Sequence, residues 1–277
     1  MNVFDYAKLI VLGDSLEDKL TSPNLVEDMS CTNSVPHIDF SMPSRSKKIT
    51  FSERTVRFPK TNTLGNDDMK GTALHFFANH ELLAIEIMAA AILQLAGNEF
   101  EGREKLLQGI LKTISDEQKH FKLYLRQIQE FGMDFGDIPN NIFFWKQFLK
   151  VKSWEEYFAL VSLTFEGANL DFALYYASIF KHYGDDKCAQ IMHTIHQDEI
   201  SHVAFGVSYL NKKADGKLWD YYNSLLPEQV TPARAKGVGF DTAGRIKAGM
   251  DMDFIQELKS YKDPFQVTNR RNKFGKI

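Results

Sequence analysis

The chain has 277 residues, 44% hydrophobic and 25% charged, so it can bury a sizeable core as one large domain or two ordinary ones. Its net charge of −3 gives no global reason to expect a nucleic-acid-binding protein. Two cysteines, Cys31 and Cys188, imply neither a disulfide framework nor a cysteine-based zinc site, which favours a reduced, cytoplasmic location. The first residues lack the basic start and long apolar stretch of a signal peptide.

The first 70 residues predict little regular structure. Residues 2–21 predict one or two short helices, and residues 22–70, rich in Pro, Ser, Thr and Asn, predict an extended arm. A structureless stretch of this length is unusual inside a domain, so we expect it to wrap the helices or cover a site, with partial disorder as the alternative. The most apolar segment, Leu82 to Leu95, is interrupted by Glu86 and predicts a buried core helix rather than a membrane span.

Helical patterning begins after Gly71. We expect four long helices with short first and third connections, which makes two αα-hairpins; their approximate ranges are 72–96, 101–131, 153–183 and 185–212. The first three should end at the glycines 97, 132 and 184. The predicted fold is an all-α, ferritin-like four-helix bundle over 71–213, with an N-terminal region over 1–70 and an extension of shorter helices over 214–277.

Two copies of one motif lie in the second and fourth helices. They are Asp116-Glu117-Gln118-Lys119-His120 and Asp198-Glu199-Ile200-Ser201-His202. A Glu and a His three residues apart share a helical face, about 60° apart, and so provide half a metal site. The helix before each motif carries its own embedded acid, Glu81 or Glu166, at a similar interval, so the hairpins resemble internal repeats.

Acids inside an apolar helix need a partner, because an unpaired buried carboxylate costs several kcal/mol. The alternative for Glu81 and Glu86 is that one of them faces solvent while the other binds a Lys or Arg. A solvated or hydrogen-bonded role is the alternative for each motif alone. Taken together, the residues predict a carboxylate-bridged two-metal centre with these ligands: Glu81, Glu117, His120, Glu166, Glu199 and His202. Four carboxylates and two imidazoles favour iron or manganese, as an iron–iron, iron–manganese or manganese–manganese pair.

Three nearby residues are predicted to support the ligands without binding metal. Asp116 and Asp198 are candidates to accept a hydrogen bond from a metal-bound His, in particular the His of the opposite hairpin; a solvated helix acid is the alternative. His196 shares a face with Glu199 and His202, and we favour a supporting role for it over that of an additional ligand.

Two further acids, Glu86 and Asp171, each follow an expected ligand by five residues. On an ideal helix this spacing offsets them by about 140° from Glu81 and Glu166, so they share a metal with those residues only if a π-bulge distorts the helix. We therefore place Glu86 and Asp171 around the ligands rather than among them.

The segments 80–86, 116–121, 164–171 and 198–203 resemble the ferritin-like di-iron carboxylate superfamily, in particular an uncharacterised bacterial family related to tRNA-modifying di-iron monooxygenases. The segment Thr231–Gly237 is similar to that family's C-terminal part, and the likeness covers roughly residues 60–260. The resemblance implies a ferritin-like fold and a di-iron site on the same six residues. It supplies no substrate.

The leading hypothesis is a di-iron oxidoreductase of the monooxygenase or hydroxylase type with O₂ as co-substrate. Its substrate would be a small molecule or, by analogy, tRNA; its electron donor is unidentified, and no membrane is involved. The alternative is iron handling: ferroxidase, storage or peroxide detoxification. The extra residues at each end would obstruct cage packing, so we expect a monomer or small homo-oligomer, not a 24-subunit cage. A bundle that has lost its metals is a third possibility.

Overall fold

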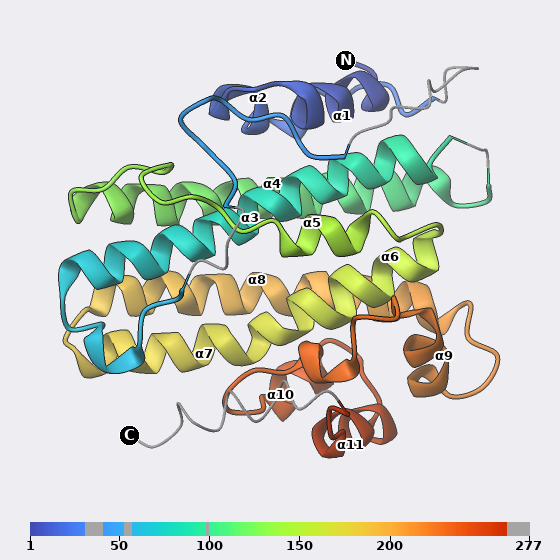
Figure 1. The fold of residues 1–277 in the computed structure, drawn as a ribbon. Coiled ribbons are helices and arrows are strands. Elements are labelled where there is room, and N and C mark those ends of the chain that lie inside the picture. Colours follow the sequence, from blue (N-terminus) through green and yellow to red (C-terminus); the bar gives the residue numbers. More distant parts are fainter. Residues whose placement is uncertain (31–40, 53–56, 98–99, 265–277) are drawn as a thin grey trace. The chain divides into compact units, whose positions relative to one another are not determined.

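The computed structural model describes residues 1–30, 41–52, 57–97 and 100–264. The protein is all-α, as predicted: the described residues contain two isolated β-bridges but no strand. The chain divides into two compact units, and each contains one long helical hairpin (Figure 1). Unit 1 comprises Met1–Pro59 and Asn66–Leu149, and unit 2 comprises Lys60–Gly65 and Lys150–Ile277. The division into three regions expected from the sequence stays a prediction.

Unit 1 consists of a short-helix segment, a hairpin and one further short helix. Its helices are α1 (Val3–Leu12), α2 (Leu16–Lys19), the 3₁₀ turn η1 (Pro23–Leu25), α3 (Asp67–Leu95), α4 (Arg103–Glu130) and α5 (Phe143–Phe148). The short helices predicted within residues 2–21 are confirmed. In the described part of the arm, regular structure is limited to two 3₁₀ turns and the first residues of α3, which begins at Asp67; residues 31–40 and 53–56 of the arm lie outside the described residues.

The first long helix begins five residues earlier than the sequence pattern predicts. The side chain of Asn66 accepts a hydrogen bond from the Met69 N–H, and Asp67 and Asp68 occupy the first turn, where acids are favourable at the positive end of a helix. Helix α3 is long and apolar enough to cross a membrane by length and composition, with a mean hydropathy of 1.5 in its most apolar window. Because 78% of that window is buried inside the protein, α3 is a core helix, as the sequence predicts.

The N-terminal segment is tied to α3 and α4 by buried polar contacts. Helix α1 packs on α3. The Lys19 ammonium donates to the Ile10 and Val11 carbonyls at the end of α1, at 2.6 and 3.2 Å, and so closes the corner between α1 and α2. From α4, the Gln118 amide donates to the Lys19 and Thr21 carbonyls, at 3.0 and 2.8 Å. The residue next to Glu117 therefore anchors the N-terminal segment.

Unit 2 contains the second hairpin and the C-terminal helices. Its elements are the 3₁₀ turn η2 (Thr61–Thr63), α6 (Trp154–Leu160), the π-helix η3 (Val161–Glu166), α7 (Gly167–His182), α8 (Asp186–Asn211), α9 (Leu218–Leu225), the 3₁₀ turn η4 (Pro232–Ala235), α10 (Thr242–Lys247) and α11 (Met252–Ser260). Helix α7 ends as predicted, because Gly184 adopts the left-handed conformation, with φ of 76°. Gly132 after α4 does the same, with φ of 77°.

The helix predicted as continuous over 153–183 contains a full π-helical turn, which was not expected. Gly206 on α8 permits it: a Cβ at this position would lie 2.5 Å from Ser162 Cβ, so only glycine lets α8 approach this closely. The Thr164 hydroxyl spans the wide turn by donating to the Ala159 carbonyl at 2.7 Å, and it also lies 2.8 Å from the Tyr222 hydroxyl of α9. The π-helix ends at Glu166.

Candidate metal centre

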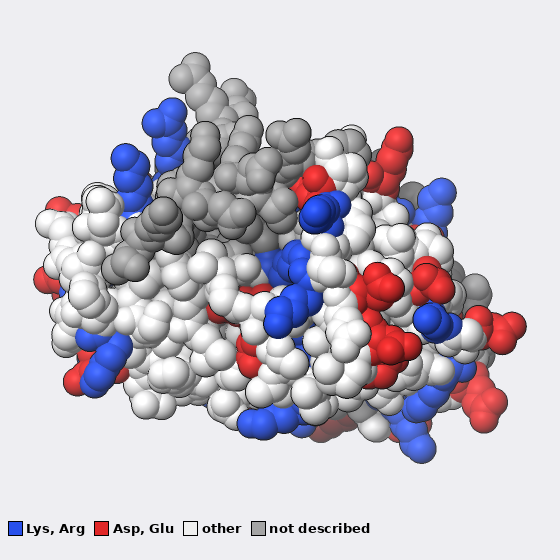
Figure 2. Space-filling view, turned by 90° about the horizontal axis from the view of Figure 1, so that it is seen from below, with Lys and Arg blue, Asp and Glu red and all other residues white. Residues whose placement is uncertain are grey.

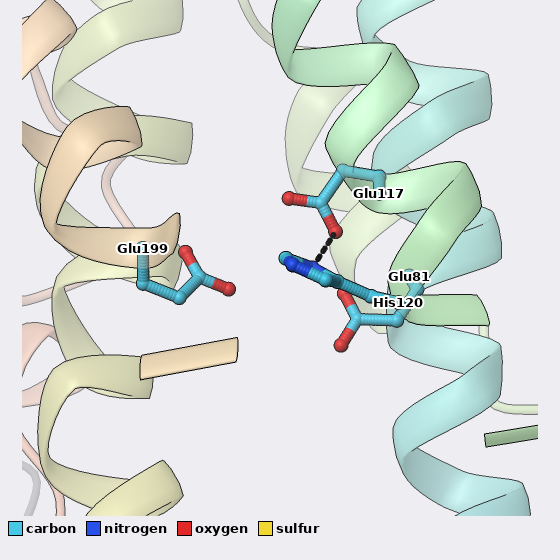
Figure 3. A group of neighbouring side chains, drawn as sticks. All are labelled: Glu81, Glu117, His120 and Glu199. Atoms are coloured by element: carbon cyan, nitrogen blue, oxygen red, sulfur yellow. Dashed lines mark hydrogen bonds and ion pairs between the residues drawn. The ribbon is translucent and has the colours of Figure 1, made fainter. Parts of the chain in front are cut away.

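The first half-site lies in unit 1 and consists of Glu81 from α3 with Glu117 and His120 from α4. All three side chains are buried, and each offers one ligand atom within 4.8 Å of the others. The three side chains extend to the same side of the two helices (Figure 3). His120 Nδ1 lies 3.4 Å from Glu117 Oε2. The helical spacing therefore brings the Glu and His of the motif together, and α3 adds a second carboxylate.

The second half-site lies in unit 2 and contains the same residue types. Glu166 stands at the end of the π-helix, and Glu199 and His202 lie one turn apart on α8. Glu166 and His202 offer ligand atoms within 4.8 Å of each other. His202 Nδ1 lies 3.4 Å from Glu199 Oε2, the same separation as in the first motif. Both sequence motifs thus adopt one local geometry.

This separation suits a shared metal better than a hydrogen bond. A hydrogen bond from a ring N–H to a carboxylate oxygen is typically about 2.9 Å long. Two neighbouring donors of an octahedral ion with bonds of about 2.1 Å stand about 3.0 Å apart. The 3.4 Å gaps at His120 and His202 need only small side-chain movements to bind an ion. Buried carboxylates with one imidazole in each half are a donor set that fits divalent iron or manganese.

Asn169 belongs to the second half-site and was missed in the sequence. It lies on α7 three residues after Glu166, and its amide donates to Glu199 Oε1 at 3.0 Å. That hydrogen bond fixes one oxygen of Glu199. The signal that could have revealed it is the spacing of three residues, which places Asn169 on the helical face of Glu166.

Glu86 lies in a buried ion-pair cluster. Arg45 from the arm donates to both carboxylate oxygens, at 3.1 and 2.8 Å, and Lys19 Nζ lies 3.4 Å away. Arg45 also donates to Asn79 at 3.0 Å. A basic partner was the alternative for an acid in this helix, and the structure shows such a partner at Glu86. The predicted place of Glu86 beside a metal stays a prediction, and these contacts do not require it.

Asp171 has the equivalent environment in unit 2. It is fully buried, and Arg245 from α10 donates to its two oxygens at 2.6 and 2.9 Å. The backbone N–H groups of Gly237 and Asp241 donate to the same carboxylate at 2.8 and 2.6 Å. The regular helix from Gly167 onward keeps Asp171 off the face of Glu166, because the π-helix ends before this pair. Glu86 and Asp171 are therefore matched: each follows a candidate ligand by five residues and binds an arginine from outside its hairpin.

His196 has partners on both ring nitrogens. Its Nε2 lies 2.8 Å from Asp241 Oδ2, and its Nδ1 lies 3.2 Å from the Gln197 amide nitrogen. Burial tends to raise the pKa of Asp241, but hydrogen bonds from the Gly244 N–H and from His196 outweigh it, so the pKa is lowered and the carboxylate is charged. The Nε2–H therefore donates to Asp241, and Nδ1 accepts from Gln197. Both nitrogens are occupied, which agrees with a supporting role and not with an additional ligand.

Two candidate acids precede the expected ligands of α4 and α8, and two further histidines lie on α3. Asp116 on α4 and Asp198 on α8 are half-buried and have interaction partners. Their predicted role as acceptors for the histidines of the opposite hairpin stays a prediction. His75 is buried and accepts a hydrogen bond from the Gly136 N–H. His80 packs on Phe144, and burial lowers its pKa to about 4.

Comparison with known proteins identifies a family but no function. The sequence profile of a family described as "Protein of unknown function (DUF455)" matches residues 13–256. No curated protein matches the sequence, and no solved structure does.

Proposed function

Since the chain belongs to this family of unknown function, we propose its function from the site itself: the two half-sites together hold two metal ions in a carboxylate-bridged centre that uses O₂ to oxidise a substrate. In this proposal the chain is a ferritin-like oxidoreductase of the monooxygenase or hydroxylase type. The ligands are the six residues of the two half-sites: Glu81, Glu117, His120, Glu166, Glu199 and His202.

The observation that carries the proposal is the repeated geometry of the two motifs. In α4 and in α8, a histidine Nδ1 stands 3.4 Å from the carboxylate three residues before it, and a second carboxylate from the preceding helix offers a ligand atom within 4.8 Å of a ligand atom of that histidine. One such group could be a local ion pair. Two groups with the same residue types, the same burial and the same spacing match the ligand set of a two-metal helical bundle.

The protein's own residues would hold the ions and keep water away from them. Four carboxylates balance the charge of two divalent ions, and two neutral imidazoles complete the set without adding charge. Asn169 would keep one oxygen of Glu199 oriented. Bound iron or manganese would supply the redox chemistry with O₂, and an external electron donor would be required.

The charge pattern favours a small-molecule substrate over tRNA. On the face that Figure 2 shows, Lys and Arg side chains are interspersed with Asp and Glu instead of forming a basic surface. The net charge of −3 agrees with this mixture. Binding to nucleic acid depends on clustered basic residues that neutralise phosphates.

Metal analysis tests the centre. The purified protein should bind about two ions per chain after growth with added iron. Glu117→Ala and His202→Ala each remove a ligand from one half-site and should lower this content. Glu104→Ala, an exposed acid on the same helix as Glu117, is the matched control and should leave it unchanged. Equal metal content in all four proteins would refute the ligand assignment.

Oxygen consumption tests the redox role separately. The iron-loaded protein with a chemical reductant should consume O₂ faster than Glu117→Ala under the same conditions. A protein that binds two ions but consumes no O₂ above the buffer rate would keep the metal centre and overturn the proposed oxidation.

A further inference from the structure

Arg245 is fully buried in α10, and its guanidinium joins several parts of unit 2. Besides both oxygens of Asp171, it donates to the Gly167 carbonyl at 3.0 Å, the Ala235 carbonyl at 2.9 Å and the Asp241 carbonyl at 3.0 Å. The guanidinium also stacks 3.9 Å from the centre of the Phe240 ring. One side chain therefore fixes α7, η4 and the start of α10 to each other.

Two of these contacts reach the turns that carry the candidate ligands. Gly167 directly follows Glu166 at the point where the π-helix becomes α7, so the bond to its carbonyl holds the end of that turn. On the other side, Asp241 binds His196, which lies one turn before Glu199 on α8. The contacts of Arg245 thus extend to both glutamate-bearing helices of the second half-site.

In unit 1, Arg45 makes the equivalent contacts. Arg45 binds both oxygens of Glu86, five residues after Glu81, and its guanidinium lies 4.6 Å from the centre of the Phe51 ring. In both units, an arginine from outside the hairpin stacks on a phenylalanine of its own segment and binds the acid that follows the ligand by five residues. A buried ion pair is a poor source of net stability compared with apolar packing, so the repetition indicates a role in geometry.

We propose that Arg245 is a positioning residue for the second half-site. It fixes the turn of Glu166 through Gly167 and Asp171, and it fixes the approach of α8 at Glu199 through Asp241 and His196, so that the ligands are in place before an ion binds. This inference rests on the proposed metal centre.

Manganese binding tests the proposal in the absence of turnover. The metal-free protein is titrated with Mn²⁺, and free Mn²⁺ is followed by electron paramagnetic resonance at a temperature where circular dichroism shows every variant folded. Arg245→Met should weaken Mn²⁺ binding by about tenfold or more, the usual effect of losing a residue that orients a metal ligand. Arg245→Lys keeps the charge but not the two-pronged contact, and should weaken binding less.

Lys236→Met is the matched control. The Lys236 ammonium ties the same C-terminal segment to α11 through the carbonyls of Leu258, Lys259 and Tyr261, without a bond to either ligand-bearing turn among these contacts. It should destabilise the segment but leave Mn²⁺ affinity within about twofold of the wild type. If Arg245→Met and Lys236→Met weaken Mn²⁺ binding equally, Arg245 only stabilises the C-terminal segment, and the proposal is wrong.

The outcomes separate this inference from the proposed function. Two Mn²⁺ ions bound by the wild type with unchanged affinity in Arg245→Met would refute positioning and keep the metal centre. A wild type that binds no Mn²⁺ and no iron would refute both. Where Arg245→Met fails to fold, His196→Gln, which removes the partner of Asp241 on α8, should still weaken Mn²⁺ binding, and unchanged affinity there would count against the proposal.

Discussion

His75 couples the stability of unit 1 to pH. Its Nε2 accepts the Gly136 N–H at 2.9 Å, and its ring stacks on Phe135 with centroids 4.8 Å apart. Burial lowers its pKa from 6.5 to about 4, and the charge of Asp137 opposes this shift only in part. Protonation would place a charge in the core and remove the acceptor that Gly136 uses.

We expect acid to destabilise the protein through His75. In the unfolded chain, His75 is protonated below about pH 6.5, whereas in the folded protein it stays neutral until about pH 4. The free energy of unfolding therefore falls as the pH drops through this window. Below about pH 4 the total decrease in the free energy of unfolding from this residue should be about 3 kcal/mol. Urea unfolding between pH 7 and pH 4 should show a shallower loss for His75→Gln, whose amide can still accept a hydrogen bond. His193→Gln, at an exposed site, should follow the wild type, and identical pH profiles for all three proteins would contradict this prediction.

The candidate ligands were predictable because their pairing is local. The distance from Glu117 to His120, and from Glu199 to His202, is set by one turn of helix, and the repeat indicated Glu81 and Glu166. The partners of the other acids were not predictable. Arg45 and Arg245 lie 41 and 74 residues from the carboxylates they bind, and no periodicity connects such positions.

At the scale of the element, the long helices were predicted to within a few residues, but the π-helix was not. Residues 161–166 contain neither Gly nor Pro, so nothing in the segment marks a distortion. Its causes lie in other elements: Gly206 of α8 makes room for the turn, and Tyr222 of α9 lies within hydrogen-bond distance of Thr164. The conformation of this helix is therefore a property of unit 2 and not of its own sequence.

Gly206→Ala should disturb the π-helix. The new methyl group would lie 2.5 Å from Ser162 Cβ and 2.9 Å from Leu163 Cδ1, so the helices must separate or the turn must shift, at a cost of about 1–3 kcal/mol. Urea unfolding measures the loss. Because Ser162→Gly removes the nearest atom, the double variant should lose less than the sum of the two single variants. Strict additivity would show that this contact does not set the turn.

At the scale of the molecule, the N-terminal residues belong with the first hairpin and the C-terminal helices with the second. The sequence pattern predicted both flanking regions, but it could not assign them to a hairpin. The assignments depend on buried contacts such as those of Gln118 with Lys19 and of Arg245 with Asp171. Each compact unit consequently carries three of the six candidate ligands and its own supporting residues.

Metal should change how the whole molecule unfolds. Two compact units can unfold in separate steps, whereas ions bound by ligands from both units would make the steps coincide. Free metal at about 100 times its dissociation constant should raise the free energy of unfolding by about 2.7 kcal/mol. Differential scanning calorimetry of the metal-free and Mn²⁺-loaded protein should therefore show a shift to higher temperature and a single transition. In His202→Ala, Mn²⁺ should cause little shift in temperature and should not merge the transitions. If Mn²⁺ leaves the thermogram of the wild type unchanged, the prediction that both units bind the same ions is wrong.

The matched arginines also bear on how such proteins can diversify. In each unit the hairpin contributes the ligands and a buried acid, and a separate segment contributes an arginine with its phenylalanine, Arg45 with Phe51 or Arg245 with Phe240. The candidate metal ligands and the residues that cover the hairpin therefore lie on different stretches of chain. A covering segment can therefore change by mutation while its arginine keeps it attached and the candidate ligands on the hairpin stay unchanged.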